Sequence, residues 1–155
     1  MARRAYLDAL TGLPNRRAVM RALVREAARA RRTGSDLSLL LVDLDDFKLI
    51  NETQGHAGGD RALRRVGAAL RTLSREGESW GRIGGDEFAL VLCAGAREAD
   101  AAVQRVQRGL EAIGVPATAA SGILEKNEPL RALYRRVDAL LFAAKERRRA
   151  ARVAT

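Results

Sequence analysis

The chain has 155 residues, and its composition of 47% hydrophobic and 30% charged residues is typical of a soluble globular protein with its own core. No run of roughly 18 or more apolar residues occurs, which excludes a membrane span within this chain, and the basic residues 1–6 lack the apolar stretch of a secretory signal. We therefore expect one domain over residues 1–155, in the cytoplasm.

The net charge of +9, from 28 Lys and Arg against 19 Asp and Glu, favours an anionic partner such as a nucleotide, a nucleic acid or an acidic lipid. Three Phe, two Tyr and one Trp are few for a surface that stacks single-stranded bases, so we expect no nucleic acid partner. The single histidine excludes a His-rich zinc site. The single cysteine, Cys93, excludes an intrachain disulfide, and its apolar strand pattern is typical of a small core residue.

The first part of the chain predicts a capped helix followed by a buried strand. Residues 8–17 are rich in turn formers, and Asn15 can cap a helix that ends near residues 33–34. The apolar face of this helix is predicted to contain Val19, Met20, Leu23, Val24 and Ala27. The near-continuous apolar run 37–42 predicts a central strand that is buried on both faces.

Acidic side chains follow this strand at once, at Asp43, Asp45 and Asp46. Carboxylates at the end of a buried strand are costly unless they are paired or bound to a metal ion. The same cluster is equally compatible with N-capping of the next helix. The residues leave both interpretations open.

Residues 47–52 predict a short helix, residues 53–59 a Gly-rich turn, and Asp60 the start of a longer helix. The turn matches neither the Walker A loop nor the dinucleotide-binding fingerprint. Its lone histidine, His56, is more typical of a structural than of a catalytic role.

The segment 79–93 predicts a β-hairpin with strands 79–83 and 87–93. Gly84 and Gly85 suit a two-residue turn in which both residues have positive φ. Asp86 and Glu87 then stand on nearly bare backbone, where two acids can hold a metal ion and a phosphate chain can approach closely. The alternative is an acidic tip that is merely solvated. If strand 37–42 lies beside the hairpin, Asp43 and Asp86 would share a divalent cation.

The remaining chain predicts a helix over residues 97–113, a short strand over 115–123 with a break at Ser121 and Gly122, and a last helix opened by Pro129. That helix carries Lys145 and a basic run at 147–149, which alone would be interpreted as a frayed tail. Its inward-facing residues are predicted to be Leu130, Leu133, Tyr134, Val137, Leu140 and Leu141. The order of elements predicts an α/β sandwich, with helices packed on a central, mostly antiparallel sheet.

Four separated segments resemble, in order and spacing, the motifs of the GGDEF domain, the catalytic module of diguanylate cyclases. They are Asp8-x-Leu10-Thr11-Gly12-Leu13-Pro14-Asn15-Arg16, Asp43-x-Asp45-x-Phe47-Lys48-x-Ile50-Asn51, Gly55-His56-x-x-Gly59-Asp60 and Arg82-x-Gly84-Gly85-Asp86-Glu87-Phe88. The resemblance covers nearly the whole chain. It implies a fold related to the nucleotidyl cyclase and polymerase palm.

The resemblance also implies a reaction, the condensation of two GTP into cyclic di-GMP with release of two pyrophosphates. Mg²⁺, with Mn²⁺ as an alternative ion, would assist at the interface of a twofold homodimer, because one domain holds one GTP. Asp43, Asp86 and the Leu44 carbonyl resemble the metal ligands, and Glu87 is a second acid of the active loop.

The remaining site residues follow from the same resemblance. Asn51 and Asp60 resemble the pair that reads the guanine edge, because an aspartate can accept from the N1 and N2 donors that adenine lacks. The phosphate contacts are expected to be Lys145, Arg149 and Lys48. Lys48 is also expected to be a catalytic residue. Phe47, Gly84 and Gly85 complete the expected substrate-binding set.

Two departures from the family pattern bear on regulation and phosphate binding. The candidate product-inhibition site has Arg75 and Glu78, where the family has Arg and Asp. The last helix has Arg148-Arg149-Ala150 where the family has Gly-Arg-Asn. They favour an alternative function, a catalytically silent GGDEF module that binds GTP or cyclic di-GMP or docks a regulatory partner. A basic nucleic-acid-binding domain is a third interpretation, but it leaves Asp43, Asp60 and Asp86 without a role.

Overall fold

The computed structural model describes residues 5–155, so the expectation that residues 1–6 are no secretory signal falls largely outside the described residues. The elements in chain order are α1 (Arg16–Thr33), β1 (Ser38–Leu44), α2 (Phe47–Leu73), β2 (Trp80–Arg82), β3 (Glu87–Leu92), α3 (Ala96–Ala112), β4 (Ala117–Ile123) and α4 (Leu130–Val153). The strands form one sheet in the order β2-β3-β1-β4, and each neighbouring pair is antiparallel.

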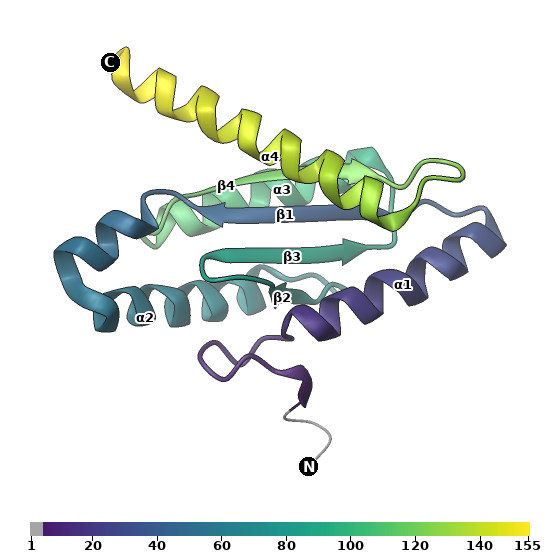
Figure 1. Cartoon of the computed structure of the whole chain (residues 1–155), viewed down its shortest axis with the longest axis horizontal. Helices are drawn as coiled ribbons and strands as arrows, with labels where there is room; N and C mark the ends of the chain where they lie inside the picture. Colours follow the sequence, from purple (N-terminus) through teal and green to yellow (C-terminus); the bar gives the residue numbers. More distant parts are fainter. Residues whose placement is uncertain (1–4) are drawn as a thin grey trace.

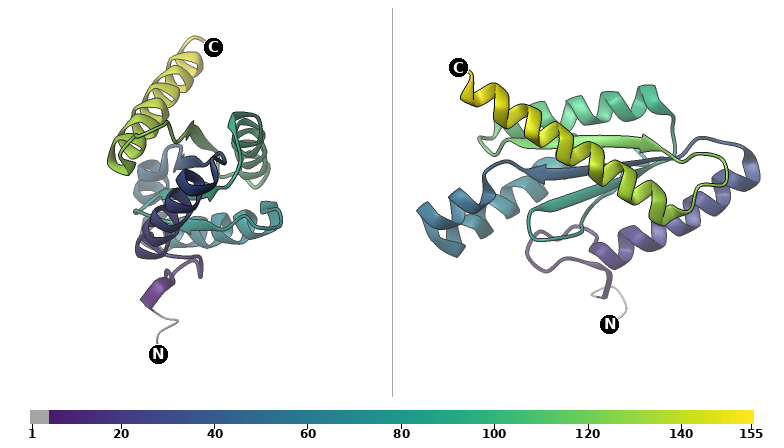
Figure 2. Two further views of the ribbon diagram at one scale, coloured as in Figure 1. Left: turned by 90° about the vertical axis from the view of Figure 1, so that its right-hand side faces the viewer. Right: turned by 45° about the horizontal axis from the view of Figure 1, so that its top comes forward.

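The sheet separates two helical layers (Figures 1 and 2). Helices α2 and α3 cover one face, and α1 and α4 cover the other. Strand β1 supplies side chains to both cores in alternation, with Leu40 and Val42 on the α2–α3 side and Leu39 and Leu41 on the α1–α4 side. The predicted α/β sandwich and the central, doubly buried strand are thereby confirmed.

Local signals set the limits of the first helix as expected. The backbone N–H of Ala18 donates to Asn15 Oδ1 at 3.0 Å, which satisfies a free donor of the first turn. Gly34 ends α1 with a φ of 69°, a left-handed conformation that glycine adopts without steric cost. Within residues 5–155, no helix combines the length and the apolar character that crossing a bilayer requires.

The expected turn at residues 53–59 is much narrower in the structure. Helix α2 runs from Phe47 to Leu73 with a single kink at Gly55, where φ is 71° and ψ is 175°. Gly59 therefore lies inside the helix, and a Cβ there would fall 2.0 Å from Asn51 Oδ1. The prediction that Asp60 opens the second helix is wrong, because only Gly55 turns the chain and Gly58 and Gly59 serve close packing across the kink.

The connection from β2 to β3 is also longer than the predicted two-residue turn. The strands end at Arg82 and resume at Glu87, and the N–H groups of Ile83 and Gly84 both point to the Glu87 carbonyl, at 2.9 and 3.4 Å. Neither Gly84 nor Gly85 has a positive φ, so that prediction is wrong. A connection of this length bends gradually and needs no left-handed residue.

Other corrections concern strand β4 and three side chains. Strand β4 has no break, since Ser121 and Gly122 pair with β1, and Gly122 lacks a side chain where Val137 packs within 2.8 Å of its Cβ position. Cys93 is exposed because it lies one residue beyond the end of β3. Val24 and Leu140 are 61% and 44% exposed, because each stands at the solvent edge of its helix stripe.

Candidate active site

The end of β1 and the tip between β2 and β3 meet at one place. Asp43 is the register partner of Glu87 across the β1–β3 pair. The next residue of β1, Leu44, donates its N–H to the Asp86 carbonyl at 3.1 Å. Two acids of the tip thus lie beside the acid that ends the buried strand, which is the condition for a shared cation.

Lys145 of α4 reaches the same place from the other helical layer. Its ammonium lies 2.8 Å from Asp43 Oδ1 and donates to the Leu44 carbonyl at 3.1 Å. The side chains of Lys145 and Asp43 are only 16% and 20% exposed. The predicted phosphate contact therefore binds, in this structure, two of the oxygens expected to hold the metal ion.

Two carboxyl groups of this cluster, those of Asp43 and Glu87, resist ionisation. Burial is the largest cause that raises the pKa of Asp43 to about 6, and the negative charge of Asp86 adds to it against the opposing effect of Lys145. Burial likewise raises the pKa of Glu87, with further contributions from Asp43 and Asp138. The cluster carries more negative charge than Lys145 and Arg16 compensate, so a further cation would stabilise it.

The donor set suits Mg²⁺ with help from other oxygens. No group of three or more His, Cys, Asp or Glu side chains within residues 5–155 is arranged to hold a metal ion by itself. Mg²⁺ is usually held by one or two carboxylates, with waters and substrate phosphates completing the octahedron. Asp43, Asp86, Glu87 and the Leu44 carbonyl supply hard oxygens of that kind at one strand end, so the residues fit the ion.

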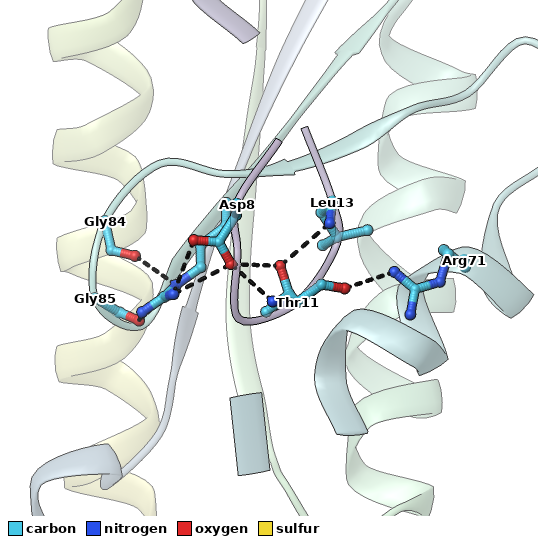
Figure 3. Close-up of polar contacts among 7 residues, drawn as sticks. Asp8, Thr11, Leu13, Arg71, Gly84 and Gly85 are labelled. Atoms are coloured by element: carbon cyan, nitrogen blue, oxygen red, sulfur yellow. Dashed lines mark hydrogen bonds and ion pairs between the residues drawn. The ribbon is translucent and has the colours of Figure 1, made fainter. Parts of the chain in front are cut away.

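A second ionic contact braces the Gly84–Gly85 tip (Figure 3). Arg82 Nη1 donates to both carboxylate oxygens of Asp8, at 3.1 and 3.2 Å. Its Nε and Nη2 donate to the Gly85 carbonyl at 3.1 and 2.8 Å, and Nε also reaches the Gly84 carbonyl at 3.1 Å. Asp8 itself accepts the N–H and the hydroxyl of Thr11, at 2.9 and 2.7 Å.

Asp8 and Arg82 belong to two of the four sequence motifs, but the sequence predicts no role for either. The structure makes them positioning residues, since each guanidinium nitrogen of Arg82 donates either to Asp8 or to a carbonyl of the tip. Arg71 of α2 holds the segment that contains Asp8, because it donates to the Thr11 carbonyl at 2.7 Å. A pair of opposite charges in two separated motifs was the available signal for this contact.

The other acids after β1 are paired with α4. Asp45 is buried, accepts the Thr118 hydroxyl at 2.7 Å, and lies 3.6 and 3.5 Å from Arg148 and Arg152. Asp46 stands at the N-cap position of α2, but its carboxylate binds Arg152 at 2.7 Å instead of capping. Of the two interpretations left open, ion pairing therefore holds for Asp45 and Asp46, and capping is wrong.

The basic run of α4 is helical to Val153 and not a frayed tail. Arg148, however, is the residue that turns toward the end of β1, where it also donates to the Ala117 carbonyl. Arg149 pairs with Glu146 at 3.1 Å and is 65% exposed. The structure therefore does not bring Arg149 to the carboxylate cluster.

Helix α2 carries the remaining expected substrate residues. Asn51 packs against Gly59, whose Cβ position also lies 3.2 Å from the Phe47 ring, so Asn51 and Phe47 lie next to the residue that precedes Asp60. Lys48 is 89% exposed and pairs with Glu52 at 3.6 Å, one turn along the helix. It does not touch the carboxylate cluster.

Arg75 and Glu78 lie at the other end of β3, beside a groove of about 580 Å³ that Leu92, Arg97 and Arg105 also line. Arg105 donates to Glu78 Oε2 at 2.5 Å, and the same oxygen accepts the Arg75 N–H at 3.1 Å. The longer glutamate side chain is thus held by an arginine of α3. Any ligand of this groove would meet Arg75 and Arg97 together with that ion pair.

Comparison with known proteins identifies the family of the chain. The family model described as diguanylate cyclase, GGDEF domain, matches residues 5–151, so the chain belongs to the GGDEF domain family. The chain is 36% identical to the diguanylate cyclase DgcP of Pseudomonas aeruginosa over 152 residues, or 92% of this chain and 23% of DgcP. It is 34% identical to DgcS of Shewanella oneidensis over 153 residues, or 94% of this chain and 51% of DgcS.

Solved structures give the same result for the fold. The GGDEF domain of DgcB from Caulobacter crescentus, in complex with cyclic di-GMP, superposes with a TM-score of 0.86 and 26% identity, covering 92% of this chain and 91% of that one. The diguanylate cyclase SiaD of Pseudomonas aeruginosa, solved with its activator SiaC, gives a TM-score of 0.82 and 35% identity, covering 90% of this chain and 58% of SiaD. The chain spans from about a quarter to about half of the curated relatives named above.

Proposed function

We propose that this domain is a diguanylate cyclase, which condenses two GTP into cyclic di-GMP and two pyrophosphates. The observation that carries the proposal is the meeting of Asp43 and the Leu44 carbonyl with Asp86 and Glu87 at one end of the β1–β3 pair. The Gly84–Gly85 backbone beside them carries no side chain, so it leaves room for a triphosphate. The named relatives support the same reaction.

The chemistry requires each 3′-OH to attack the α-phosphorus of the other GTP. A bond forms between O3′ and Pα, the bond from Pα to the bridging oxygen of the β-phosphate breaks, and pyrophosphate leaves. Mg²⁺ held by Asp43, the Leu44 carbonyl and Asp86 would neutralise the developing charge on the phosphate oxygens. Glu87 is our candidate acceptor of the 3′-OH proton, because burial and Asp43 raise its pKa toward the range suited to a general base.

Base selection is assigned to Asn51 and Asp60 of α2. Asp60 can accept from the N1 and N2 donors of guanine, and adenine offers no such pair. We expect Asp60→Ser to reduce the preference for GTP over ATP by about 10- to 100-fold in kcat/KM, because the N1 and N2 donors of guanine lose their carboxylate acceptor. Unchanged rejection of ATP by this variant would remove Asp60 from base recognition.

The reaction requires two copies of the domain. Each holds one GTP, and the two 3′-OH groups attack in opposite directions, so two domains must meet face to face across a twofold axis. The rate per protein should therefore fall on dilution, whereas an enzyme complete in one copy would keep a constant specific activity.

The first test is chromatography of the nucleotides after concentrated protein is incubated with GTP and Mg²⁺. Cyclic di-GMP from the wild type, but not from Asp86→Asn, would establish the activity. Saturable, Mg²⁺-dependent GTP binding without product would favour the silent module, for which the exposed position of Arg149 and its pairing with Glu146 are the supporting observations. A fused dimerisation segment then decides, because it restores turnover only to an enzyme that lacked its second copy.

A further inference from the structure

We infer that the Lys145 ammonium is a built-in substitute for the metal ion, and that the ion and the nucleotide bind together because each helps to move Lys145 from one partner to the other. The inference rests on the proposed function and extends it to the order in which the site is filled. Without the ion, Lys145 neutralises part of the charge of the cluster; with ion and nucleotide bound, it becomes a phosphate ligand.

Lys145 contacts two oxygens at the end of one strand. Asp43 Oδ1 and the Leu44 carbonyl come from consecutive residues of β1, and the ammonium lies 2.8 and 3.1 Å from them. These are the atoms that the site would offer to Mg²⁺, which binds oxygen at about 2.0–2.1 Å. A divalent ion bound to both atoms would lie beside the ammonium and repel it. The two cations would also compete for the negative charge of Asp43.

The Lys145 ammonium needs another anionic partner if it leaves Asp43. Its side chain is largely buried at 16% exposure, so leaving Asp43 without a new anionic partner would strand a charge or expose the helix face that covers β1. The triphosphate supplies that partner, because phosphate oxygens accept from an ammonium more strongly than neutral groups do. The ion alone must therefore displace Lys145 at a cost, whereas the ion with nucleotide does not.

Lys145 belongs to a helix that can keep its place while this side chain moves. Arg148 and Arg152 attach α4 to Asp45 at 3.6 and 3.5 Å, independently of Asp43. Asp45 is also held by the Thr118 hydroxyl at 2.7 Å. These contacts are made to Asp45 and not to Asp43. A change of partner at Asp43 therefore needs only a new rotamer of Lys145 and no shift of the helix.

The test measures binding of Mn²⁺, as a probe of the ion, from the electron paramagnetic resonance signal of free Mn²⁺ without nucleotide. Lys145→Met should bind Mn²⁺ about tenfold or more tightly than the wild type, because the competing cation is gone. Lys126→Met is the matched control, since it removes one positive charge at an exposed turn away from the cluster. It should leave Mn²⁺ affinity unchanged.

A second measurement tests the coupling. A non-hydrolysable GTP analogue should raise the Mn²⁺ affinity of the wild type and of Lys126→Met by a larger factor than that of Lys145→Met, and Mn²⁺ should raise the affinity for the analogue by the same factor. Circular dichroism of each variant checks that the fold is kept.

The outcomes separate the inference from the proposed function. Equal Mn²⁺ affinity in Lys145→Met and wild type, with loss of binding in Asp43→Asn, would overturn the role of Lys145 while leaving the metal site in place. Equal affinity in Asp43→Asn and wild type, even with the analogue, would overturn the metal site itself and the inference with it. Tighter binding in Lys145→Met that the double variant with Asp43→Asn abolishes would establish both.

Discussion

Two ion pairs of nearly equal geometry flank the Gly84–Gly85 tip, and the pKa values of their carboxyl groups shift in opposite directions. Arg82 and Asp8 lie 3.1 Å apart with side chains 17% and 19% exposed, and Lys145 and Asp43 lie 2.8 Å apart at 16% and 20%. Yet the pKa of Asp8 is lowered and that of Asp43 is raised to about 6.

The difference comes from what else surrounds each carboxylate. Burial acts against the ionisation of Asp8, but the hydroxyl and N–H of Thr11, together with Arg82, outweigh it. Burial of Asp43 is answered by Lys145 alone, and the neighbouring charge of Asp86 adds to the burial effect. The charged form of Asp8 is therefore favoured by its partners, whereas that of Asp43 is not, and we infer that only the second pair is exchanged.

The two pairs therefore divide the work of the site. The Asp8–Arg82 contact fixes the shape of the tip through the carbonyls of Gly84 and Gly85. In the proposed function, the Asp43–Lys145 contact would hold the carboxylate cluster together until substrate and cation bind. A close approach of opposite charges does not by itself say which role a pair has.

The largest effect is expected from Asp86→Asn, which removes the neighbouring charge that distinguishes Asp43 from Asp8. Turnover of GTP should fall by about 10³-fold or more, because the pyrophosphate loses its charge neutralisation. The unfolding midpoint should stay close to that of the wild type, since Asp86 lies in a loop. Chromatography of cyclic di-GMP and urea unfolding measure the two properties, and near-normal turnover would exclude Asp86 from the site.

The next largest effect should come from Asp8→Asn, which breaks the satisfied pair. The free energy of unfolding should drop by about 1–2 kcal/mol, because Arg82 loses its charged partner in a mostly buried place. Turnover should fall as well, since the tip is no longer held. Asp100→Asn, at an exposed position of α3, is the matched control and should change neither urea unfolding nor activity.

The pH dependence of stability should separate the two carboxylates directly. Asp8 has a folded pKa below its ordinary 3.8, so its contribution is present above pH 3.8 and is lost as the pH falls through the lower folded value. Asp43 has a folded pKa of about 6, so the metal-free protein should lose stability as the pH rises from about 4 to about 6.

Urea unfolding with a chelator present measures this dependence. Asp43→Asn should reduce the loss between about pH 4 and about pH 6 by about 1 kcal/mol after allowance for partial exposure, and the raised pKa of Glu87 leaves a smaller loss in this variant. Asp8→Asn should reduce only the acid loss, of which Glu26 and Glu128 keep a part because their pKa values are lowered too. The same pH profile in wild type and Asp43→Asn would show that the cluster does not resist ionisation.

The smallest effect is expected at a third pair, Lys48 and Glu52, which lie 3.6 Å apart with side chains 89% and 58% exposed. Glu52→Gln should change the free energy of unfolding by less than about 0.5 kcal/mol, because water screens such a pair. Turnover should also be unchanged, since Glu52 stands outside the proposed machinery. A decrease of more than about 1 kcal/mol in the free energy of unfolding would mean that the exposure of an ion pair does not predict its contribution to stability.

Local patterns along the chain were sufficient for most of the fold. The apolar run 37–42 identified the central strand, Asn15 and Gly34 marked the ends of α1, and the order of elements predicted the sandwich. They failed where glycines were interpreted as turn formers. Gly59 and Gly122 are instead places of close packing, and only the neighbouring element reveals that use.

The sequence by itself determined the residue types of the site, their order in four motifs and hence the family. Only the tertiary structure decided which charges meet: Lys145 reaches a carbonyl 101 residues away, Arg82 reaches Asp8 across 74 residues, and Arg148 rather than Arg149 faces the end of β1. The physical reason is that periodicity fixes which side of one helix or strand is apolar. The rotation of a helix over the sheet, and the pairing of distant charges, depend on packing against elements far along the chain.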